Sequence, residues 1–424
     1  MKNRRVVITG LGVVSPNGTN VSNFKRAIQQ GTSGIRYIEQ LKELKFSCQV
    51  AGFPVYKKNY LNNYFNSIQL KGLNASGMEY GVISGIDAWK DAGFSINKTD
   101  TPNWDCGVIF GTGILGVDKF REAVYKVDQG KVRRLGSTSV TQTMASGISA
   151  FLGGMLGCGN VVTTNSSACS TGTEAILMGY DRISSGKAEI ILAGSTSDSG
   201  PYVWGGFDAM RILPYKYNDN PTVASRPMSA TASGFVPGSG AGALVIESLD
   251  SALKRGASIY AEILGGHVNS GGQRNGGSMT APNSVAVQQC ITKAIENSNI
   301  KATQIDAING HLTATGKDST EIQNWSEALG RSGIDFPYVN SLKSMIGHCL
   351  AASGSIESVA TVLQLKENFI FGNINCEDLH PDIASVVSRD RVPVQTIYTS
   401  PNIIAKASFG FGDVNACIIF KKYN

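Results

Sequence analysis

Seven short runs of apolar and mostly β-branched residues recur along the chain, and segments long enough to form helices separate most of them. Each run has the length and composition of a buried strand. The runs cover residues 6–10, 106–110, 189–194, 242–247, 261–266, 306–310 and 416–420. Strands that alternate with helices at this spacing predict a layered α/β fold whose sheet is mixed rather than purely parallel.

The composition favours a globular enzyme over other classes of protein. Of the 424 residues, 42% are hydrophobic, 17% are charged and 49 are glycine, which is typical of a compact α/β chain with many tight turns. The net charge is only +6 and no block of five basic residues occurs, so we expect no nucleic-acid partner. No run approaches about 20 continuous apolar residues, so we expect no membrane insertion.

The N-terminal segment and the cysteines favour a cytoplasmic location. The start, MKNRRVVITGLGVVSPNG, superficially imitates a signal peptide, but Gly10 and Gly12 interrupt its apolar run and no small-x-small cleavage pattern follows. The eight cysteines are scattered and form no C-x-x-C pair, so we expect no metal site and interpret most of them as small buried side chains.

Two glycine-rich segments, at 233–247 and 408–420, each lead into an apolar strand. This similarity suggests an internal duplication, with one half at residues 1–255 and the other at residues 256–424. Glycine followed by a strand is common in α/β enzymes, so the pattern alone is weak.

The segment TTNSSACSTGTEAI, residues 163–176, contains a candidate nucleophile. Ile176, Tyr180 and Ile183 recur at helical spacing, and Gly186 is a suitable stop. Cys169 would then lie at a helix N-terminus, where the helix dipole and free N–H groups favour a thiolate. An arbitrary cysteine is more often a small core residue, so this interpretation depends on its partners.

Two of the four histidines supply such partners. His311 follows the predicted strand 306–310, and His348 lies five residues after Lys343. One thiol, two imidazoles and one ammonium suit carbon–carbon bond formation on thioesters. The thiolate accepts an acyl group, neutral imidazoles donate hydrogen bonds to a developing enolate, and backbone N–H groups hold the second oxyanion.

The blocks that carry these residues resemble the active-site blocks of the β-ketoacyl-acyl carrier protein synthases, the type I and type II elongating ketosynthases. These blocks are TTNSSACSTGTEA, NGHLTATGKDSTE, NSLKSMIGHCLAASG and ASFGFGDVNA. The likeness extends to RRVVITGLGVVSPNG and to residues 224–247, so it spans nearly the whole chain. It implies a thiolase fold: two similar halves stacked as five α/β/α/β/α layers and usually paired as a homodimer.

The resemblance also implies a role for each catalytic residue. Cys169 corresponds to the acyl-accepting nucleophile, and His311 and His348 to the histidines that promote decarboxylation of malonyl-acyl carrier protein. Lys343 corresponds to a lysine whose charge keeps the neighbouring imidazole neutral. Phe411 matches the gating phenylalanine, whose N–H joins that of Cys169 in the oxyanion hole.

Other positions match residues that hold the substrate. Thr280, Thr313 and Thr315 match threonines near the phosphopantetheine arm, and Ile114 matches a residue that borders the acyl tunnel. Glu321 belongs to an acidic pair that follows the His311 block and is expected to support the site structurally.

The implied reaction is a decarboxylative Claisen condensation that gives a 3-oxoacyl-acyl carrier protein in fatty acid, polyene or polyketide biosynthesis. The partners are acyl and malonyl forms of an acyl carrier protein, which brings the phosphopantetheine, so no bound cofactor is expected. Because such carriers are acidic, we expect a basic docking site at Arg133, Arg134 and Arg211.

Departures from the family pattern leave alternatives open. Leu312 replaces the usual glycine, the turn after His311 is one residue shorter, and Asp413 replaces a second glycine after Phe411. One alternative is a chain-length-factor-like subunit that pairs with a paralogue in a heterodimer, although such subunits typically lose the cysteine. Another is a thiolase-fold enzyme that uses coenzyme A thioesters, although such enzymes lack the second histidine.

Overall fold

The computed structural model of the protein describes residues 4–96 and 100–424. Ten strands form one mixed sheet in the order β10-β9-β13-β14-β8-β1-β7-β6-β4-β5. They are β1 (Val6–Val14), β4 (Cys106–Thr112), β5 (Val162–Thr163), β6 (Ile190–Ser197), β7 (Gly240–Ser248), β8 (Ala261–Ser270), β9 (Ala307–Asn309), β10 (Tyr338–Asn340), β13 (Ile403–Gly410) and β14 (Val414–Lys422). Two small sheets pair β2 (Ile35–Tyr37) with β3 (Val50–Gly52), and β11 (Phe369–Ile370) with β12 (Ile397–Tyr398).

The α-helices of the described residues differ widely in length. They are α1 (Val21–Gln30), α2 (Glu39–Glu43), α3 (Ser67–Gly72), α4 (Ser76–Asp91), α5 (Val117–Asp128), α6 (Gly147–Leu156), α7 (Thr171–Ser184), α8 (Pro201–Ala209), α9 (Leu249–Lys254), α10 (Ser284–Asn297), α11 (Asp318–Leu329), α12 (Lys343–Ile346), α13 (Ser353–Glu367) and α14 (Pro381–Ala384). Short 3-10 turns precede α7 and α13, at Ala168–Ser170 and Leu350–Ala352.

The large sheet repeats one strand pattern twice. In the first half β1, β7 and β6 pair antiparallel in turn, and β6, β4 and β5 then pair parallel. In the second half β8, β14 and β13 pair antiparallel, and β13, β9 and β10 pair parallel. The halves join where β1 pairs antiparallel with β8. The repeat explains why the two glycine-rich segments, at residues 233–247 and 408–420, resemble each other. The boundary between the halves at residues 255 and 256 stays a prediction.

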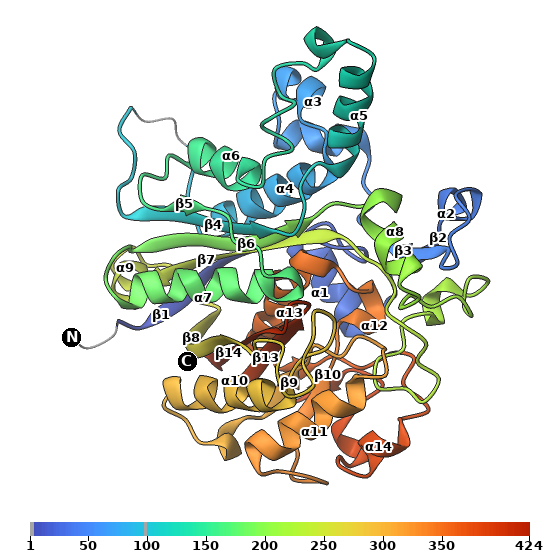
Figure 1. Cartoon of the computed structure of the whole chain (residues 1–424). Coiled ribbons are helices and arrows are strands. Elements are labelled where there is room, and N and C mark those ends of the chain that lie inside the picture. Colours follow the sequence, from blue (N-terminus) through green and yellow to red (C-terminus); the bar gives the residue numbers. More distant parts are fainter. Residues whose placement is uncertain (1–3, 97–99) are drawn as a thin grey trace.

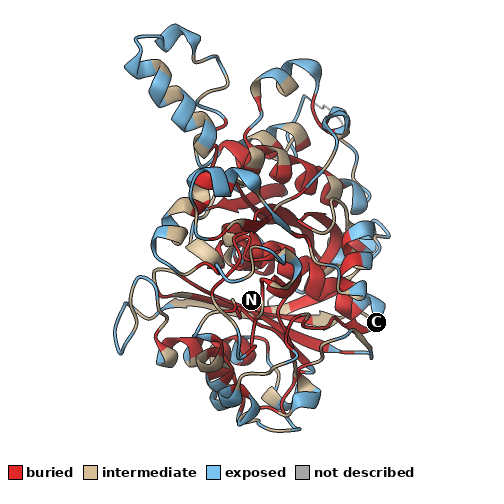
Figure 2. Ribbon diagram, turned by 90° about the vertical axis from the view of Figure 1, so that its right-hand side faces the viewer, coloured by how far each residue is buried: buried red, intermediate tan, exposed pale blue. Residues whose placement is uncertain are grey.

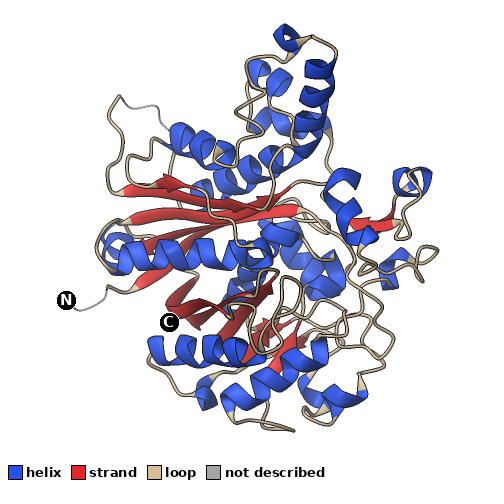
Figure 3. Cartoon of the chain, in the orientation of Figure 1, coloured by secondary structure: helices blue, strands red, loops and turns tan. Residues whose placement is uncertain are grey.

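The helices and the two half-sheets form five layers (Figures 1 and 3). Helices α4 and α6 cover the outer face of the first half-sheet, and α10 contacts β8 and β14 on the outer face of the second, with α11 packed beside it. Between the half-sheets lie α7 and α13, which contact each other and strands of both halves. This arrangement confirms the expected α/β/α/β/α stacking.

The two central helices approach each other at a pair of glycines. A Cβ atom on Gly172 would lie 2.4 Å from the backbone nitrogen of Ser355, and one on Gly354 would lie 2.5 Å from that of Thr173. Neither position can therefore accept a side chain without moving backbone. This contact brings together the N-terminal ends of α7 and α13, and with them the segments that carry Cys169 and His348.

All seven predicted strand runs lie within or overlap strands of the large sheet. The runs at 106–110 and 261–266 begin β4 and β8 at the expected residues, and α7 covers the predicted helix. The prediction missed β5 and β10, which are two and three residues long and too short to show a pattern. It also missed β13, because Lys406 interrupts the apolar run at its centre.

Burial is concentrated in the half-sheets and the helices between them (Figure 2). Six of the eight cysteines are buried, and Cys158 and Cys169 are partly buried, so most thiols are small core side chains as expected. Helix α5 lies in the lobe at the top of Figure 1 and has no buried residue. Among the residues described here, no helix has the length and apolar composition required to cross a membrane.

Candidate active site

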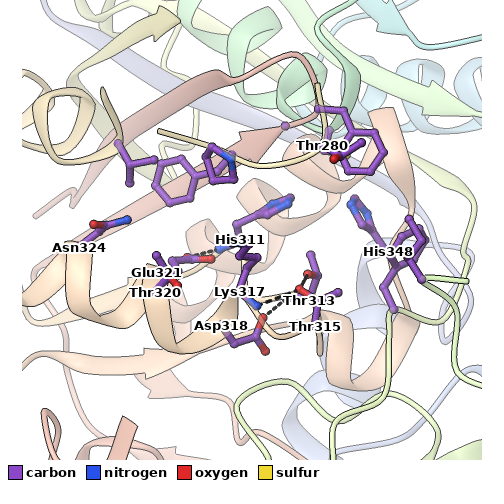
Figure 4. A pocket seen from close by; sticks show the side chains of 18 of the residues that line it. Thr280, His311, Thr313, Thr315, Lys317, Asp318, Thr320, Glu321, Asn324 and His348 are labelled. Atoms are coloured by element: carbon purple, nitrogen blue, oxygen red, sulfur yellow. Dashed lines mark hydrogen bonds between the residues drawn. The ribbon is translucent and has the colours of Figure 1, made fainter. Parts of the chain in front are cut away.

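A pocket of about 600 Å³ lies where the two halves meet. Cys169 reaches it from the first half, and His311, His348 and Phe411 from the second. The Sγ atom of Cys169 and one nitrogen of each imidazole all lie within 4.8 Å of one another. The rings of His311 and His348 lie next to each other, with centroids 5.3 Å apart (Figure 4). The predicted nucleophile and both predicted histidines therefore share one site.

Cys169 lies in the 3-10 turn that leads into α7. The next residue fixes this turn, because the Ser170 hydroxyl lies 3.1 Å from the carbonyl of Ser408 and 2.9 Å from that of Val414. Burial raises the pKa of the Cys169 thiol to about 11, although the N–H of Phe411 and the charge of Lys343 act in the opposite direction. The expectation that the helix terminus favours a thiolate in the free protein is thus corrected, because desolvation outweighs it.

Phe411 lies in the turn between β13 and β14 and lines the pocket. Its backbone N–H faces the Cys169 sulfur, as an oxyanion hole made by these two residues requires. Its ring lies 6.2 Å from that of Phe207, between centroids. Gly412, which follows it, has φ of 90°, a conformation that glycine adopts without steric cost.

Asp413 connects this turn to the loop at residues 271–283. Its buried carboxylate accepts hydrogen bonds from the N–H of Gln273, at 2.9 Å, and from the N–H of Asn283, at 2.8 Å. Its backbone carbonyl accepts a third from the N–H of Gly271, at 3.0 Å. The residue that departs from the glycine pattern therefore fastens the Phe411 turn to a loop that carries other pocket residues, including Thr280.

His348 is held in one tautomer by its neighbours. The backbone N–H of Leu350 donates to Nδ1 of His348, at 3.1 Å, and the hydroxyl of Ser353 lies 2.9 Å from the same atom. Nδ1 must therefore be an acceptor, so the neutral ring carries its hydrogen on Nε2. Burial, followed by the charges of Lys343 and Lys406, holds the pKa of His348 well below its usual value.

The His311 loop is held by two carboxylates from the first turn of α11. Glu321 accepts hydrogen bonds of 2.7 Å from the N–H groups of His311 and Leu312. Asp318 accepts from the N–H groups of Thr313 and Ala314, at 2.9 and 3.0 Å, as Figure 4 shows in part. Burial raises the pKa of Glu321 to about 7. These bonds explain how the shortened turn keeps a fixed shape.

Leu312 adopts an unfavourable backbone conformation in this turn, with φ of 21°. Its side chain is fully buried in the second half's core. The apolar contacts made by this buried side chain offset the cost of this backbone conformation, which glycine, the usual residue of the family here, adopts more easily.

The imidazole of His311 is kept neutral but is less constrained than that of His348. Burial is the largest cause that holds the pKa of His311 well below its usual value, and Lys343, His348 and Lys406 add to it. Its Nδ1 atom is buried and has no hydrogen-bond partner within residues 4–96 and 100–424. Either tautomer of this ring is therefore compatible with its surroundings.

Lys343 belongs to a buried charge cluster that also contains Glu357 and Lys406. The Glu357 carboxylate forms ion pairs with both lysines, and the Lys406 pair measures 2.8 Å. All three side chains are at most 1% exposed. One carboxylate balances only one of the two ammonium groups, so the cluster keeps positive charge close to both histidines. Burial lowers the pKa of Lys406.

The donor atoms of Cys169, His311 and His348 are close enough to bind one metal ion. One feature of the site opposes this use, because the net positive charge of the cluster formed by Lys343, Glu357 and Lys406 repels a dication. The arrangement is better suited to acyl transfer and to hydrogen bonding.

The other predicted substrate residues divide into two groups. Thr280, Thr313 and Thr315 line the pocket. Ile114 does not line it and is 56% exposed, so its place in an acyl tunnel stays a prediction.

The predicted docking arginines are all exposed. Arg211 lies between Met210 and Ile212, which line the pocket. Arg133 and Arg134 form a 3-10 turn after α5. Their contribution to docking stays a prediction.

Sequence reasoning missed Glu357, Lys406 and Ser353. Lys406 was visible as a single charge within the apolar run IIAKASF, and Glu357 as a single acid in the apolar helix segment SIESVATVL. A charge at a core position signals a buried partner. Ser353 carried no comparable signal, because serine is common at helix starts.

Comparisons with known proteins match most of the chain to one family. Residues 3–252 match the family model "Beta-ketoacyl synthase, N-terminal domain", and residues 260–377 match "Beta-ketoacyl synthase, C-terminal domain". A 3-oxoacyl-[acyl-carrier-protein] synthase 2 of Vibrio harveyi is 33% identical over 100% of this chain and 99% of its own length.

Two solved structures are similar over nearly the whole chain. A β-ketoacyl synthase from Burkholderia phymatum STM815 has a TM-score of 0.89 and 27% identity, over 99% of this chain and 100% of that one. A ketosynthase of a type II polyketide synthase, bound to the hexaketide and in complex with its acyl-carrier protein, has a TM-score of 0.86 and 27% identity, over 99% and 100% of the two chains.

Proposed function

The chain belongs to the β-ketoacyl synthase family, and from this premise we propose how its residues divide the work of a 3-oxoacyl-[acyl-carrier-protein] synthase. The reaction is the condensation of an enzyme-bound acyl chain with malonyl-acyl carrier protein, accompanied by loss of carbon dioxide. The observation that carries the assignment of residues is the meeting of Cys169, His311 and His348 within 4.8 Å.

In the first half-reaction the Cys169 sulfur attacks the thioester carbonyl of an acyl-carrier protein. Because the Cys169 thiol has a pKa of about 11, its proton must leave as the new bond forms. His348 accepts from Leu350 at Nδ1 and carries its hydrogen on Nε2, so its Nε2 cannot accept the thiol proton. The tautomer of His311 is not fixed, so His311 is the proton acceptor. The N–H groups of Cys169 and Phe411 hold the oxyanion. The carrier's thiolate then leaves and takes the proton from His311.

In the second half-reaction malonyl-acyl carrier protein replaces the first carrier. His311 and His348, both neutral, donate hydrogen bonds to the thioester oxygen, so that carbon dioxide leaves and an enolate forms. The enolate carbon attacks the acyl group on Cys169, and the carbon–sulfur bond breaks. The product is a 3-oxoacyl-acyl carrier protein two carbons longer than the acyl donor, and the Cys169 thiolate regains a proton from water.

The partner is an acyl carrier protein, which brings both substrates on its phosphopantetheine, and the reaction needs no further cofactor. Thr280, Thr313 and Thr315 line the pocket, and in this proposal Thr313 and Thr315 contact the amide of this arm while Thr280 lies near its entrance. Arg211, which lies between two residues that line the pocket, would contact the acidic carrier together with Arg133 and Arg134. We also propose a cytoplasmic homodimer, in which Ile114 would border the acyl tunnel.

A chain-length-factor-like subunit is the weaker candidate. A subunit without condensing activity needs neither a nucleophile nor neutral imidazoles. Here Cys169, His311 and His348 are all present, and burial, together with the charges of Lys343 and Lys406, favours the neutral form of both imidazoles. The second histidine likewise argues against a degradative thiolase or an initiating synthase that uses coenzyme A thioesters.

The test is intact-mass analysis after incubation with acyl-acyl carrier proteins of several chain lengths, followed by malonyl-acyl carrier protein. We expect an acyl adduct that Cys169→Ala abolishes and that malonyl-acyl carrier protein discharges as a 3-oxoacyl product. Cys158→Ser is the matched control, because Cys158 is the other partly buried thiol, and it should leave the adduct intact. A folded protein that accepts no acyl chain would contradict the assignment and favour the partner-subunit alternative.

A further inference from the structure

Two cysteines remote from the condensation chemistry contact each other in the outer core of the first half. The sulfur atoms of Cys106 and Cys158 lie 3.1 Å apart, although 52 positions separate the residues in the chain. Cys106 begins β4, and Cys158 lies between the end of α6 and β5 (Figure 1). Cys106 belongs to the apolar cluster that includes residues of α4 and α6, and Cys158 packs against the edge of that cluster as a partly buried residue.

Backbone hydrogen bonds fix the two segments that carry these thiols. The N–H of Asn103 donates to the carbonyl of Gly157, and the N–H of Gly159 donates back to the carbonyl of Asn103, both at 2.8 Å. The N–H of Asn160 donates to the carbonyl of Cys106, also at 2.8 Å. These backbone hydrogen bonds hold the two segments side by side and so keep the two sulfur atoms in contact. The thiols need only a short further approach to reach the bond length of about 2.05 Å.

The two thiols differ in access to solvent. Cys106 is fully buried, whereas Cys158 is partly exposed. A reagent in solution therefore meets Cys158 first, and Cys106 lies behind it as a resolving thiol. We propose that Cys106 and Cys158 are a modification site, which forms a reversible intramolecular disulfide with a low-molecular-weight disulfide such as oxidised glutathione.

The exchange takes place in two balanced steps. The Cys158 thiol loses its proton and its sulfur attacks one sulfur of oxidised glutathione, so that one glutathione leaves as a thiolate and takes up a proton. The Cys106 thiol then loses its proton, and its sulfur attacks the Cys158 sulfur of the mixed disulfide and releases the second glutathione. The cysteine pair loses two electrons and two protons, which the two glutathione thiols gain. The second step is the slower, because the contact with Cys158 and burial raise the pKa of Cys106.

The bond would connect the start of β4 to the segment between α6 and β5. It would close a long loop of the chain, and a cross-link of this kind disfavours the unfolded state more than the native one. The expected consequence is a more stable first half, while the site around Cys169 is left as it is.

The experiment uses the full chain, equilibrated with excess oxidised glutathione, blocked by alkylation and mapped by mass spectrometry without reduction. We expect a peptide that links Cys106 to Cys158 in most molecules, and its loss after treatment with dithiothreitol. The thermal midpoint of the oxidised protein should rise by several degrees, and dithiothreitol should reverse this rise. Buried Cys349 should stay a free thiol and so report that the protein remains folded.

Cys158→Ser is the matched variant, because it changes a partly exposed side chain and leaves the core intact. After the same treatment it should show no shift of the thermal midpoint and no linked peptide. Two results with folded wild-type protein would overturn the proposal. One is a stable glutathione adduct on Cys158 without release of the second glutathione, and the other is the persistence of both free thiols. A glutathione adduct on Cys169 is distinguished from one on Cys158 by the peptide that carries it.

Discussion

The backbone N–H of Leu350 donates a hydrogen bond of 3.1 Å to Nδ1 of His348. This contact places the hydrogen of the neutral ring on Nε2 and makes the imidazole a fixed hydrogen-bond donor. The fold supplies it without a charged partner, because Leu350 belongs to the 3-10 turn that starts the central helix α13. A donor of this kind favours enolate formation over proton abstraction.

Replacement of His348 by alanine should therefore separate the half-reactions. We expect release of carbon dioxide from malonyl-acyl carrier protein to fall by about 10²–10³-fold, as for the loss of one oxyanion donor. Formation of the acyl adduct on Cys169 should continue. Carbon dioxide release and intact mass measure the two steps separately. His348→Gln, whose amide can donate from a similar position, should retain more activity than the alanine variant, and equal losses would argue against a donor role.

The reactivity of Cys169 should depend on pH as expected for a thiol whose pKa is raised. Because its pKa is about 11, the thiolate fraction, and with it the rate of alkylation by iodoacetamide, should rise about tenfold per pH unit from neutral pH. The rise should continue above pH 9, provided that the protein stays folded there. Lys343→Met should lower the rate, since the Lys343 charge favours the thiolate. A rate that levels off at or below pH 9 would contradict this account.

The Glu357 carboxylate should contribute more to stability than either of its lysine partners. Glu357→Gln leaves Lys343 and Lys406 buried without a countercharge, and such a loss costs about 3–5 kcal/mol. Lys406→Met leaves one complete ion pair and should destabilise less. Urea denaturation of both variants measures the free energies of unfolding. A Glu357→Gln variant no less stable than Lys406→Met would show that the second lysine is not charged in the folded protein.

Asp413 should couple the Phe411 turn to the loop at residues 271–283. Asp413→Gly removes the acceptor for the N–H groups of Gln273 and Asn283, while glycine accepts the φ of 62° at this position. We expect faster hydrogen exchange in both segments and a changed KM for the carrier-bound substrates. Asp413→Asn, which keeps one acceptor oxygen, should show a smaller effect. Faster exchange in only one of the two segments would show that they move independently.

Arg211 should act in recognition of the carrier and not in chemistry. Arg211→Glu should raise the KM for acyl-acyl carrier protein, most strongly at low salt. It should leave the alkylation of Cys169 by iodoacetamide unchanged. Arg26→Glu is the matched control, because Arg26 is exposed on α1 and does not line this pocket. Equal effects of the two charge reversals would indicate a general effect of net charge.

The sequence by itself determined the repeating elements and the identity of the reacting groups. The apolar runs predicted strands at all seven positions, because an uninterrupted apolar run that is buried in a sheet shows its pattern locally. The placement of Cys169 at the start of α7 was also readable, since helix periodicity and stop signals are local. The pairing of the thiol with His311 and His348 followed from the rarity of histidine and from family-like blocks.

Only the tertiary structure decided the electrostatics and the connections of the site. The burial of an atom and the charges around it depend on neighbours that are distant in sequence. No local pattern therefore showed that the Cys169 thiol would have a raised pKa. For the same reason Lys406 could not be paired with Glu357, 49 residues away, nor Asp413 with the N–H groups of Gln273 and Asn283. The meeting of the segments that carry Cys169 and His348 was equally hidden, because it depends on Gly172 and Gly354, which let two helices of different halves approach each other in the folded chain.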